Sequence, residues 1–126
     1  MRFPKARGRT TRRNPGSMNK MEAEYREYLR PRLNAGEIVA IDYERITFKL
    51  ADDTRYTPDF FLLMADGTIE LHEVKGFLED DAWVKIKVAA EQHPWFTFRL
   101  VRKQAKKHGG GWDIKAVGVG CEGSKA

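Results

Sequence analysis

The stretch YTPDFFLLMADGTIELHEVKG, residues 56–76, decides the fold of this chain. Two largely apolar segments, residues 58–64 and 68–75, flank the turn at residues 65–67, and this pattern predicts a β-hairpin. The first segment is apolar on both faces, as expected of a strand in the interior of a sheet. Asp59 at its start is the exception, because a carboxylate is not expected on a buried strand.

The second segment of the hairpin also carries unexpected charges. Side chains alternate between the two faces of a strand, so Glu73 and Lys75 share a face with Ile69 and Leu71. The apolar face of this strand therefore continues into a carboxylate and an ammonium group. Both strands of the hairpin are thus predicted to carry charged residues at the same end.

The length of the turn sets the register of the two strands. A three-residue loop, with Gly67 in the left-handed conformation, places Asp59 opposite Glu73 on one face. A two-residue loop would place Asp59 opposite Val74 and send its side chain to the other face. We expect the three-residue loop.

Two opposed carboxylates on adjacent strands, with Cβ atoms about 5 Å apart, repel each other unless a positive group lies between them. A divalent cation fits, and oxygen ligands without a nearby His or Cys favour Mg²⁺, with Mn²⁺ as a substitute. Lys75 on the same face could orient an attacking water or offset charge on phosphorus. The alternative is a surface ion pair of Glu73 with Lys75, with Asp59 capping a turn.

The residues that form this pattern resemble a known superfamily. Pro58-Asp59 followed by Glu73-Val74-Lys75 is similar to the PD-(D/E)xK nuclease signature, and the flanking order resembles the phage endonuclease I group of Holliday-junction resolvases. That order is Tyr43-Glu44, YTPDF, EVKG, an acidic LEDD segment, a basic helix and QHP. The resemblance covers residues 18–101. It implies an α/β fold, with a restriction-endonuclease-like mixed β-sheet flanked by helices in a single domain.

The resemblance also implies roles for individual residues. Asp59 and Glu73 would bind the metal together with the carbonyl of Val74, and Lys75 would assist catalysis. A helix before the first strand supplies another glutamate in this family, and the match falls on Glu22. The residues themselves leave an alternative open, because the segment 19–22 also spells a capping box in which Glu22 folds back on the start of its own helix.

Composition bounds the domain organisation and the environment. A chain of 126 residues suffices for one domain, predicted here at residues 17–119, with residues 120–126 as a disordered tail. A lone cysteine excludes an internal disulfide. No apolar run approaches the length of a membrane span, and residues 1–17 lack a signal-peptide core. We therefore expect a soluble protein with no membrane partner, located in the cytoplasm of a cell or, if the gene is a phage gene, of its host.

Positive charge is concentrated outside the predicted domain. Residues 1–16 contain six Lys or Arg and no acidic residue, although the net charge of the whole chain is only +5. Such an arm favours salt-sensitive contact with nucleic-acid phosphates, and a solvated disordered tail is the alternative. The candidate DNA-binding residues are Arg7, Arg9, Arg12 and Arg13 in the arm, Lys85 and Lys87 on a helix, and Lys103, Lys106 and Lys107 in a basic loop expected to be mobile.

The remaining elements follow from periodicity and capping signals. We expect helices at residues 19–33 and 81–92. We expect strands at residues 37–42, 45–50, 96–101 and 112–119, with a polar turn at 51–54; whether strand 96–101 runs parallel to the hairpin stays open. His72 faces away from Glu73 and is expected to be a packed or rim residue.

These observations predict a Mg²⁺-dependent DNA endonuclease that hydrolyses phosphodiester bonds, with branched DNA or four-way junctions favoured by the resemblance. The resemblance to the resolvase group also implies a homodimer. In those resolvases a connection before the signature takes part in exchanging elements between two subunits, whereas the corresponding connection in this chain is short and differently composed. Two alternatives stay open. One is a non-catalytic nucleic-acid-binding protein on a nuclease fold, and the other is a nuclease subunit of a larger recombination or packaging complex.

Overall fold

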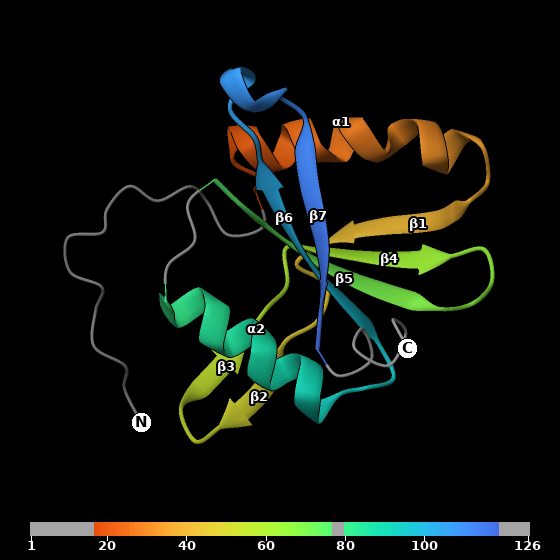
Figure 1. The fold of residues 1–126 in the computed structure, drawn as a ribbon. Coiled ribbons are helices and arrows are strands. Elements are labelled where there is room, and N and C mark those ends of the chain that lie inside the picture. Colours follow the sequence, from red (N-terminus) through yellow and green to blue (C-terminus); the bar gives the residue numbers. More distant parts are fainter. Residues whose placement is uncertain (1–16, 77–79, 119–126) are drawn as a thin grey trace, which may run out of the picture.

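A five-stranded mixed sheet forms the centre of the protein in the computed structural model, which describes residues 17–76 and 80–118 (Figure 1). Its strand order is β1-β4-β5-β6-β7, and β2 and β3 form a separate two-stranded sheet. The elements in chain order are α1 (Lys20–Asn34), β1 (Ile38–Tyr43), β2 (Phe48–Ala51), β3 (Thr54–Tyr56), β4 (Phe60–Met64), β5 (Ile69–Lys75), α2 (Asp80–Gln92), β6 (Thr97–Lys103), the 3₁₀ helix η1 (Lys106–His108) and β7 (Trp112–Val117).

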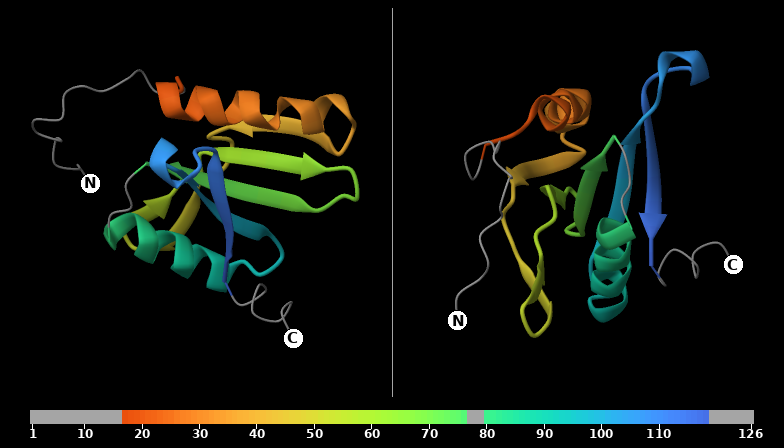
Figure 2. Two further views of the ribbon diagram at one scale, coloured as in Figure 1. Left: turned by 45° about the horizontal axis from the view of Figure 1, so that its top comes forward. Right: turned by 90° about the vertical axis from the view of Figure 1, so that its left-hand side faces the viewer.

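The sheet lies between two layers. Helix α1 covers one face, and α2 together with the β2–β3 hairpin covers the other (Figure 2). Strand β6 runs parallel to β5, whereas the other neighbouring strands of this sheet are antiparallel. The helix α2 forms the crossover that a parallel pair needs, and this settles the orientation of the strand after α2.

The central hairpin has the predicted register. Phe61 pairs with Leu71, and the N–H of Met64 donates to the carbonyl of Thr68 at 2.9 Å. Gly67 has a φ of 90°, as a three-residue loop of this kind requires. Extending the same register by one pair places Asp59 opposite Glu73.

Each face of the sheet has its own apolar core. On the α1 face, Tyr25 and Leu29 pack against Phe60 and Leu62 of β4. On the α2 face, Leu71 and other residues pack against α2 and against the β2–β3 hairpin. The sheet is therefore buried on both faces, which explains why β4 is apolar at every position.

Helix α1 begins as the sequence predicted. Asn19 is its N-cap and accepts from the N–H of Glu22 at 2.8 Å, while Glu22 Oε1 accepts from the N–H of Asn19 at 2.9 Å. The first turn of α1 lies against the end of β5, because a Cβ added to Gly76 would lie 2.7 Å from Met21 Cε. The helix thus brings Glu22 to the end of the hairpin that carries the charged residues.

Three local predictions were wrong. The strand expected at residues 45–50 begins only at Phe48, and β3 had been missed because its three residues are too short for an alternation pattern. The basic loop expected after residue 101 is more regular than predicted, since β6 continues to Lys103 and residues 106–108 form η1. The predicted arm at residues 1–16 and tail at residues 120–126 lie outside the described residues.

Candidate active site

Asp59 lies at the point where β4 begins, and its backbone and side chain both hold the strand ends together. Its carbonyl accepts from the N–H of Glu44 at 2.8 Å. Its carboxylate Oδ2 accepts from the N–H of Val74 at 2.8 Å, and the residue is only 8% exposed. This hydrogen bond fixes the Asp59 carboxylate beside the segment that carries Glu73.

The carboxylate of Glu73 has a different partner on each oxygen. The hydroxyl of Tyr56 donates to Oε1 at 2.9 Å, and Lys75 Nζ lies 3.3 Å from Oε2. Glu73 is 6% exposed, and Tyr56 is equally buried in the core of the α2 face. The predicted ion pair of Glu73 with Lys75 therefore exists, but it is not a pair at a frayed strand end, because its carboxylate is buried.

The carboxyl groups of Asp59 and Glu73 are close enough that ionisation of both is unfavourable. Burial raises the pKa of Asp59, and the charge of Glu73 raises it further, against the lowering effect of the Val74 N–H. Burial also raises the pKa of Glu73, although Lys75 and the Tyr56 hydroxyl oppose the shift. Such a site has a high affinity for positive charge, whether a proton or a metal ion.

Glu73 and Lys75 open onto a hollow of about 230 Å³ on the α2 side of the molecule. Its wall includes the side chains of Tyr56 and Thr57 from the end of the β2–β3 hairpin, and residues of the first turns of α2. Three of the lining residues are cationic: Arg55, Lys75 and Lys85. Asp81 is the acidic residue of the rim, so the rim carries more positive than negative side chains around the buried carboxylate, which suits an anionic substrate.

Glu22 caps its own helix and also lies near the carboxylate pair, the two positions that the sequence left open. It forms the capping box of α1, and its Oε1 also accepts from the hydroxyl of Tyr43 at 2.7 Å. Its side chain is buried, and its negative charge contributes to raising the pKa values of Asp59 and Glu73. Glu22 therefore lies near the carboxylate pair, with one oxygen already engaged.

Within residues 17–76 and 80–118, no cluster of three or more His, Cys, Asp or Glu side chains is arranged to hold a metal ion. The buried pair Asp59 and Glu73 nevertheless fits Mg²⁺, which takes one or two carboxylates and retains several waters. The backbone N–H of Val74 donates a hydrogen bond to the carboxylate of Asp59. The roles of the Val74 carbonyl and of Glu22 as metal ligands stay predictions.

The predicted DNA-binding lysines are not equivalent in the structure. Lys85 lines the hollow beside Lys75. Lys87, which could have reached a phosphate near the site, instead places Nζ 5.0 Å from the centre of the Trp83 ring. Lys103 Nζ lies 2.5 Å from Glu24 and is also near the Trp112 ring. Lys106 and Lys107 are exposed on η1, and the candidate arginines of the arm lie outside the described residues.

Sequence reasoning missed two tyrosines that hydrogen-bond the site carboxylates. Tyr56 and Tyr43 both belong to the segments that carry the resemblance, but no role was assigned to either hydroxyl. Tyr56 could not have been placed, because β3 had not been predicted. Tyr43 meets Glu22 from 21 residues further along the chain, and its hydroxyl also lies 3.3 Å from the carbonyl of Ser17.

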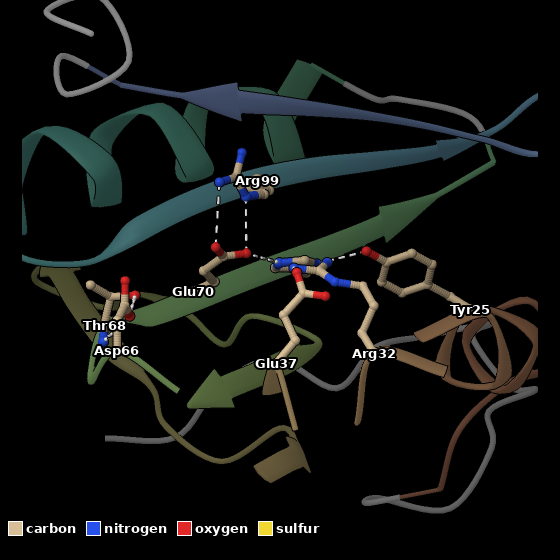
Figure 3. A network of polar contacts seen from close by, with 8 residues as sticks. Tyr25, Arg32, Glu37, Asp66, Thr68, Glu70 and Arg99 are labelled. Carbon is tan, nitrogen blue, oxygen red and sulfur yellow. Dashed lines mark hydrogen bonds and ion pairs between the residues drawn. The ribbon is translucent and has the colours of Figure 1, made fainter. Parts of the chain in front are cut away.

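A second, partly buried polar cluster lies on the opposite face of β5, around Glu70 (Figure 3). Glu70 Oε1 accepts from Arg99 Nε at 3.0 Å and from His72 Nε2 at 2.9 Å, and His72 Nδ1 lies 2.8 Å from the hydroxyl of Tyr25. Burial lowers the pKa of His72, so the ring is neutral and Nδ1 accepts from Tyr25. Of the two positions expected for His72, packed or at the rim, the structure shows the packed one.

No helix in the described part of the chain is long and apolar enough to span a bilayer. Comparisons with known proteins give no match to a family model, a curated protein or a solved structure. The functional assignment therefore depends on the site itself.

Proposed function

We propose that this protein is a Mg²⁺-dependent DNA endonuclease of the PD-(D/E)xK type. The observation that carries the proposal is the Asp59 and Glu73 pair, two buried carboxylates from neighbouring strands with Lys75 beside one of them. A protein that only binds nucleic acid has no need of opposed buried carboxylates, because they weaken both the fold and the attraction for phosphate. The mixed sheet flanked by helices is compatible with a restriction-endonuclease-like fold.

Asp59 and Glu73 would hold the metal ion, with the Val74 carbonyl and Glu22 as further candidates. The bound ion would supply charge neutralisation at the phosphate and a water of lowered pKa. Lys75 is the residue of this chain that would orient the attacking water or stabilise negative charge at phosphorus. Attack by water breaks the bond between phosphorus and the 3′ oxygen, which leaves a 5′-phosphate and a 3′-hydroxyl.

The surface around the hollow supports DNA as the substrate. In the parallel register of β5 and β6, Arg102 lies beside Lys75 and on the same face. Arg102 also lines a neighbouring hollow of about 320 Å³, formed with Lys103, Gln104, Ala105, His108 and Asp113. Cations therefore extend from the carboxylate pair across the next strand, in the way that contacts to successive phosphates require.

Branched DNA is the substrate that we propose, on the basis of the sequence resemblance to junction resolvases. The cations around the hollow, Lys75, Lys85 and Arg102, are expected to contact backbone phosphates, and such contacts carry no direct sequence information. A homodimer would allow two strands of a junction to be cut together.

The proposal is tested by incubating the purified protein with a four-way junction, a linear duplex and a supercoiled plasmid, in Mg²⁺ or in EDTA. Asp59→Asn and Lys75→Ala should each reduce cleavage by at least about 1000-fold, since they remove a metal ligand and a charge in the transition state. Asp52→Asn and Lys49→Ala are matched controls, because both side chains are exposed on the β2–β3 hairpin.

Cleavage of the plasmid and the duplex but not of the junction would retain the nuclease and reject the branched substrate. Equal cleavage by wild type and Asp59→Asn would reject the active site. Binding to DNA without any cleavage would favour the alternative of a non-catalytic nucleic-acid-binding protein.

A further inference from the structure

Tyr56 reaches the candidate active site from outside the central sheet. It ends β3, and it pairs with Phe48 in the small β2–β3 hairpin. Its ring is packed in the core of the α2 face, while its hydroxyl donates to Glu73 Oε1 at 2.9 Å. The ring position is thus set by the core of the α2 face, which includes Phe48 and Leu71.

We propose that Tyr56 is a positioning residue that occupies Glu73 Oε1 and so leaves Oε2, the oxygen beside Lys75, as the one that meets the metal ion. This inference depends on the proposed function, in which Glu73 is a metal ligand. It assigns to Tyr56 no contact with substrate. Its effect is exerted through Glu73 alone.

The hydroxyl has the properties that this role needs. A phenol hydroxyl is protonated at neutral pH, and the packing of the Tyr56 ring in the core holds this donor at Glu73 Oε1. A hydrogen bond to one carboxylate oxygen fixes the rotation of the whole group. Tyr56 donates to Oε1, whereas Lys75 Nζ lies 3.3 Å from Oε2, so the two groups lie at different oxygens of Glu73.

The arrangement also has a consequence for Lys75. Its Nζ lies 3.3 Å from Oε2, the oxygen that Tyr56 leaves available. A divalent cation on Oε2 would repel the ammonium at that distance. Lys75 would then turn from Glu73 toward the hollow that it shares with Lys85. The same carboxylate would hold Lys75 in place before the metal ion binds and release it afterwards.

The test is direct measurement of Mn²⁺ affinity without DNA, by isothermal titration calorimetry, for wild type and Tyr56→Phe. The ring remains, so the core should persist, and circular dichroism melting checks this. We expect Mn²⁺ binding to weaken by about tenfold, the lower end of the effect of losing a residue that orients a metal ligand. Tyr28→Phe is the matched control, because Tyr28 is about half exposed on α1 and contacts no carboxylate of the site.

A double-mutant cycle distinguishes positioning of Glu73 from a general effect on the fold. In a Glu73→Ala background the Tyr56→Phe change should cost no further Mn²⁺ affinity, because the hydroxyl has no carboxylate left to hold. For cleavage, Tyr56→Phe should raise the Mg²⁺ concentration needed for half-maximal rate by a similar factor. The KM for DNA at saturating Mg²⁺ should stay unchanged.

Unchanged Mn²⁺ affinity in Tyr56→Phe, or an equal loss in the Glu73→Ala background, would overturn the inference even if wild type cleaves DNA. A wild-type protein that binds Mn²⁺ but cuts no DNA would overturn the proposed nuclease, and the role of Tyr56 would still be decided by the affinities. A wild-type protein that binds no Mn²⁺ would overturn both.

Discussion

Strand β5 carries two polar clusters, a partly buried one around Glu70 on one face and the buried carboxylate pair on the other, and they are built in opposite ways. On the α1 face, Glu70 meets Arg99 and His72. Burial raises the pKa of Glu70, but the hydrogen bonds from these two residues and the charge of Arg99 outweigh burial and bring it to about 2. On the α2 face, Glu73 meets Asp59, and the pKa values of both carboxyl groups are raised.

This difference separates polar groups that stabilise the fold from polar groups kept for another purpose. In the Glu70 cluster every charge has an opposite or neutral partner, so the cluster holds α1, β5 and β6 together. In the Asp59 and Glu73 pair, like charges are buried beside each other, which costs stability. Residues that reduce stability in this way are concentrated at functional sites.

The largest expected change in the stability of the protein comes from removing Glu70. Glu70→Ala should lower the free energy of unfolding by about 3 kcal/mol at pH 7, because it leaves a buried histidine N–H and the Arg99 charge without a partner. Since the folded-state pKa of Glu70 is depressed, this contribution is present above pH 4.5 and is lost as the pH falls toward 2.

Urea unfolding at several pH values measures this contribution. The difference in the free energy of unfolding between wild type and Glu70→Ala should decrease steadily from pH 4.5 to pH 2. Glu27→Ala is a suitable control, because Glu27 forms an exposed pair with Arg30 on α1. A Glu70→Ala protein as stable as this control would remove the contrast between the two clusters.

The next effect has the opposite sign. Asp59→Asn should stabilise the metal-free protein at pH 8, because asparagine keeps the acceptor for the Val74 N–H and removes the buried negative charge. The folded-state pKa of Asp59 is raised, so its contribution to stability is present near pH 4 and is lost as the pH rises. A tenfold difference in proton affinity corresponds to about 1.4 kcal/mol, and we expect at least this gain.

Thermal melts in EDTA at pH 4.5 and pH 8 provide the measurement. The Tm of Asp59→Asn should exceed that of wild type by several degrees at pH 8 and match it at pH 4.5. Addition of Mg²⁺ should raise the Tm of wild type but not that of the variant. If Asp59→Asn melted below wild type at pH 8, the description of a strained carboxylate pair would be wrong.

The smallest effect concerns the cations next to the site. If Arg102 contacts one phosphate, Arg102→Gln should reduce the slope of log K against log salt by about 0.9 on duplex DNA. Fluorescence anisotropy with labelled duplex in EDTA, between low and moderate salt, measures the slope without cleavage. Arg26→Gln on the exposed side of α1 serves as the control, and equal slopes for both variants would place Arg102 outside the DNA contact.

The sequence predicted the carboxylate pair better than it predicted the surroundings of the pair. The period-two alternation and the turn at residues 65–67 were sufficient for the register that opposes Asp59 and Glu73, since both are local signals. The capping box of α1 was also predictable, because it depends on four consecutive residues. Tyr56, Arg102 and the pairing of Arg99 with Glu70 were not, because each meets its partner across elements distant in the sequence.

Local sequence therefore determined which charged residues share a face of the hairpin, because side-chain alternation is a property of the backbone itself. Tertiary structure decided which partners each of those charged residues has. It brought the Tyr56 hydroxyl to one oxygen of Glu73, Arg99 to Glu70, and the first turn of α1 with Glu22 to the end of β5. Burial raises the pKa of both Glu70 and Glu73, and the partners that the fold supplies decide the outcome: Arg99 and His72 bring the pKa of Glu70 down, whereas the pKa of Glu73 stays raised.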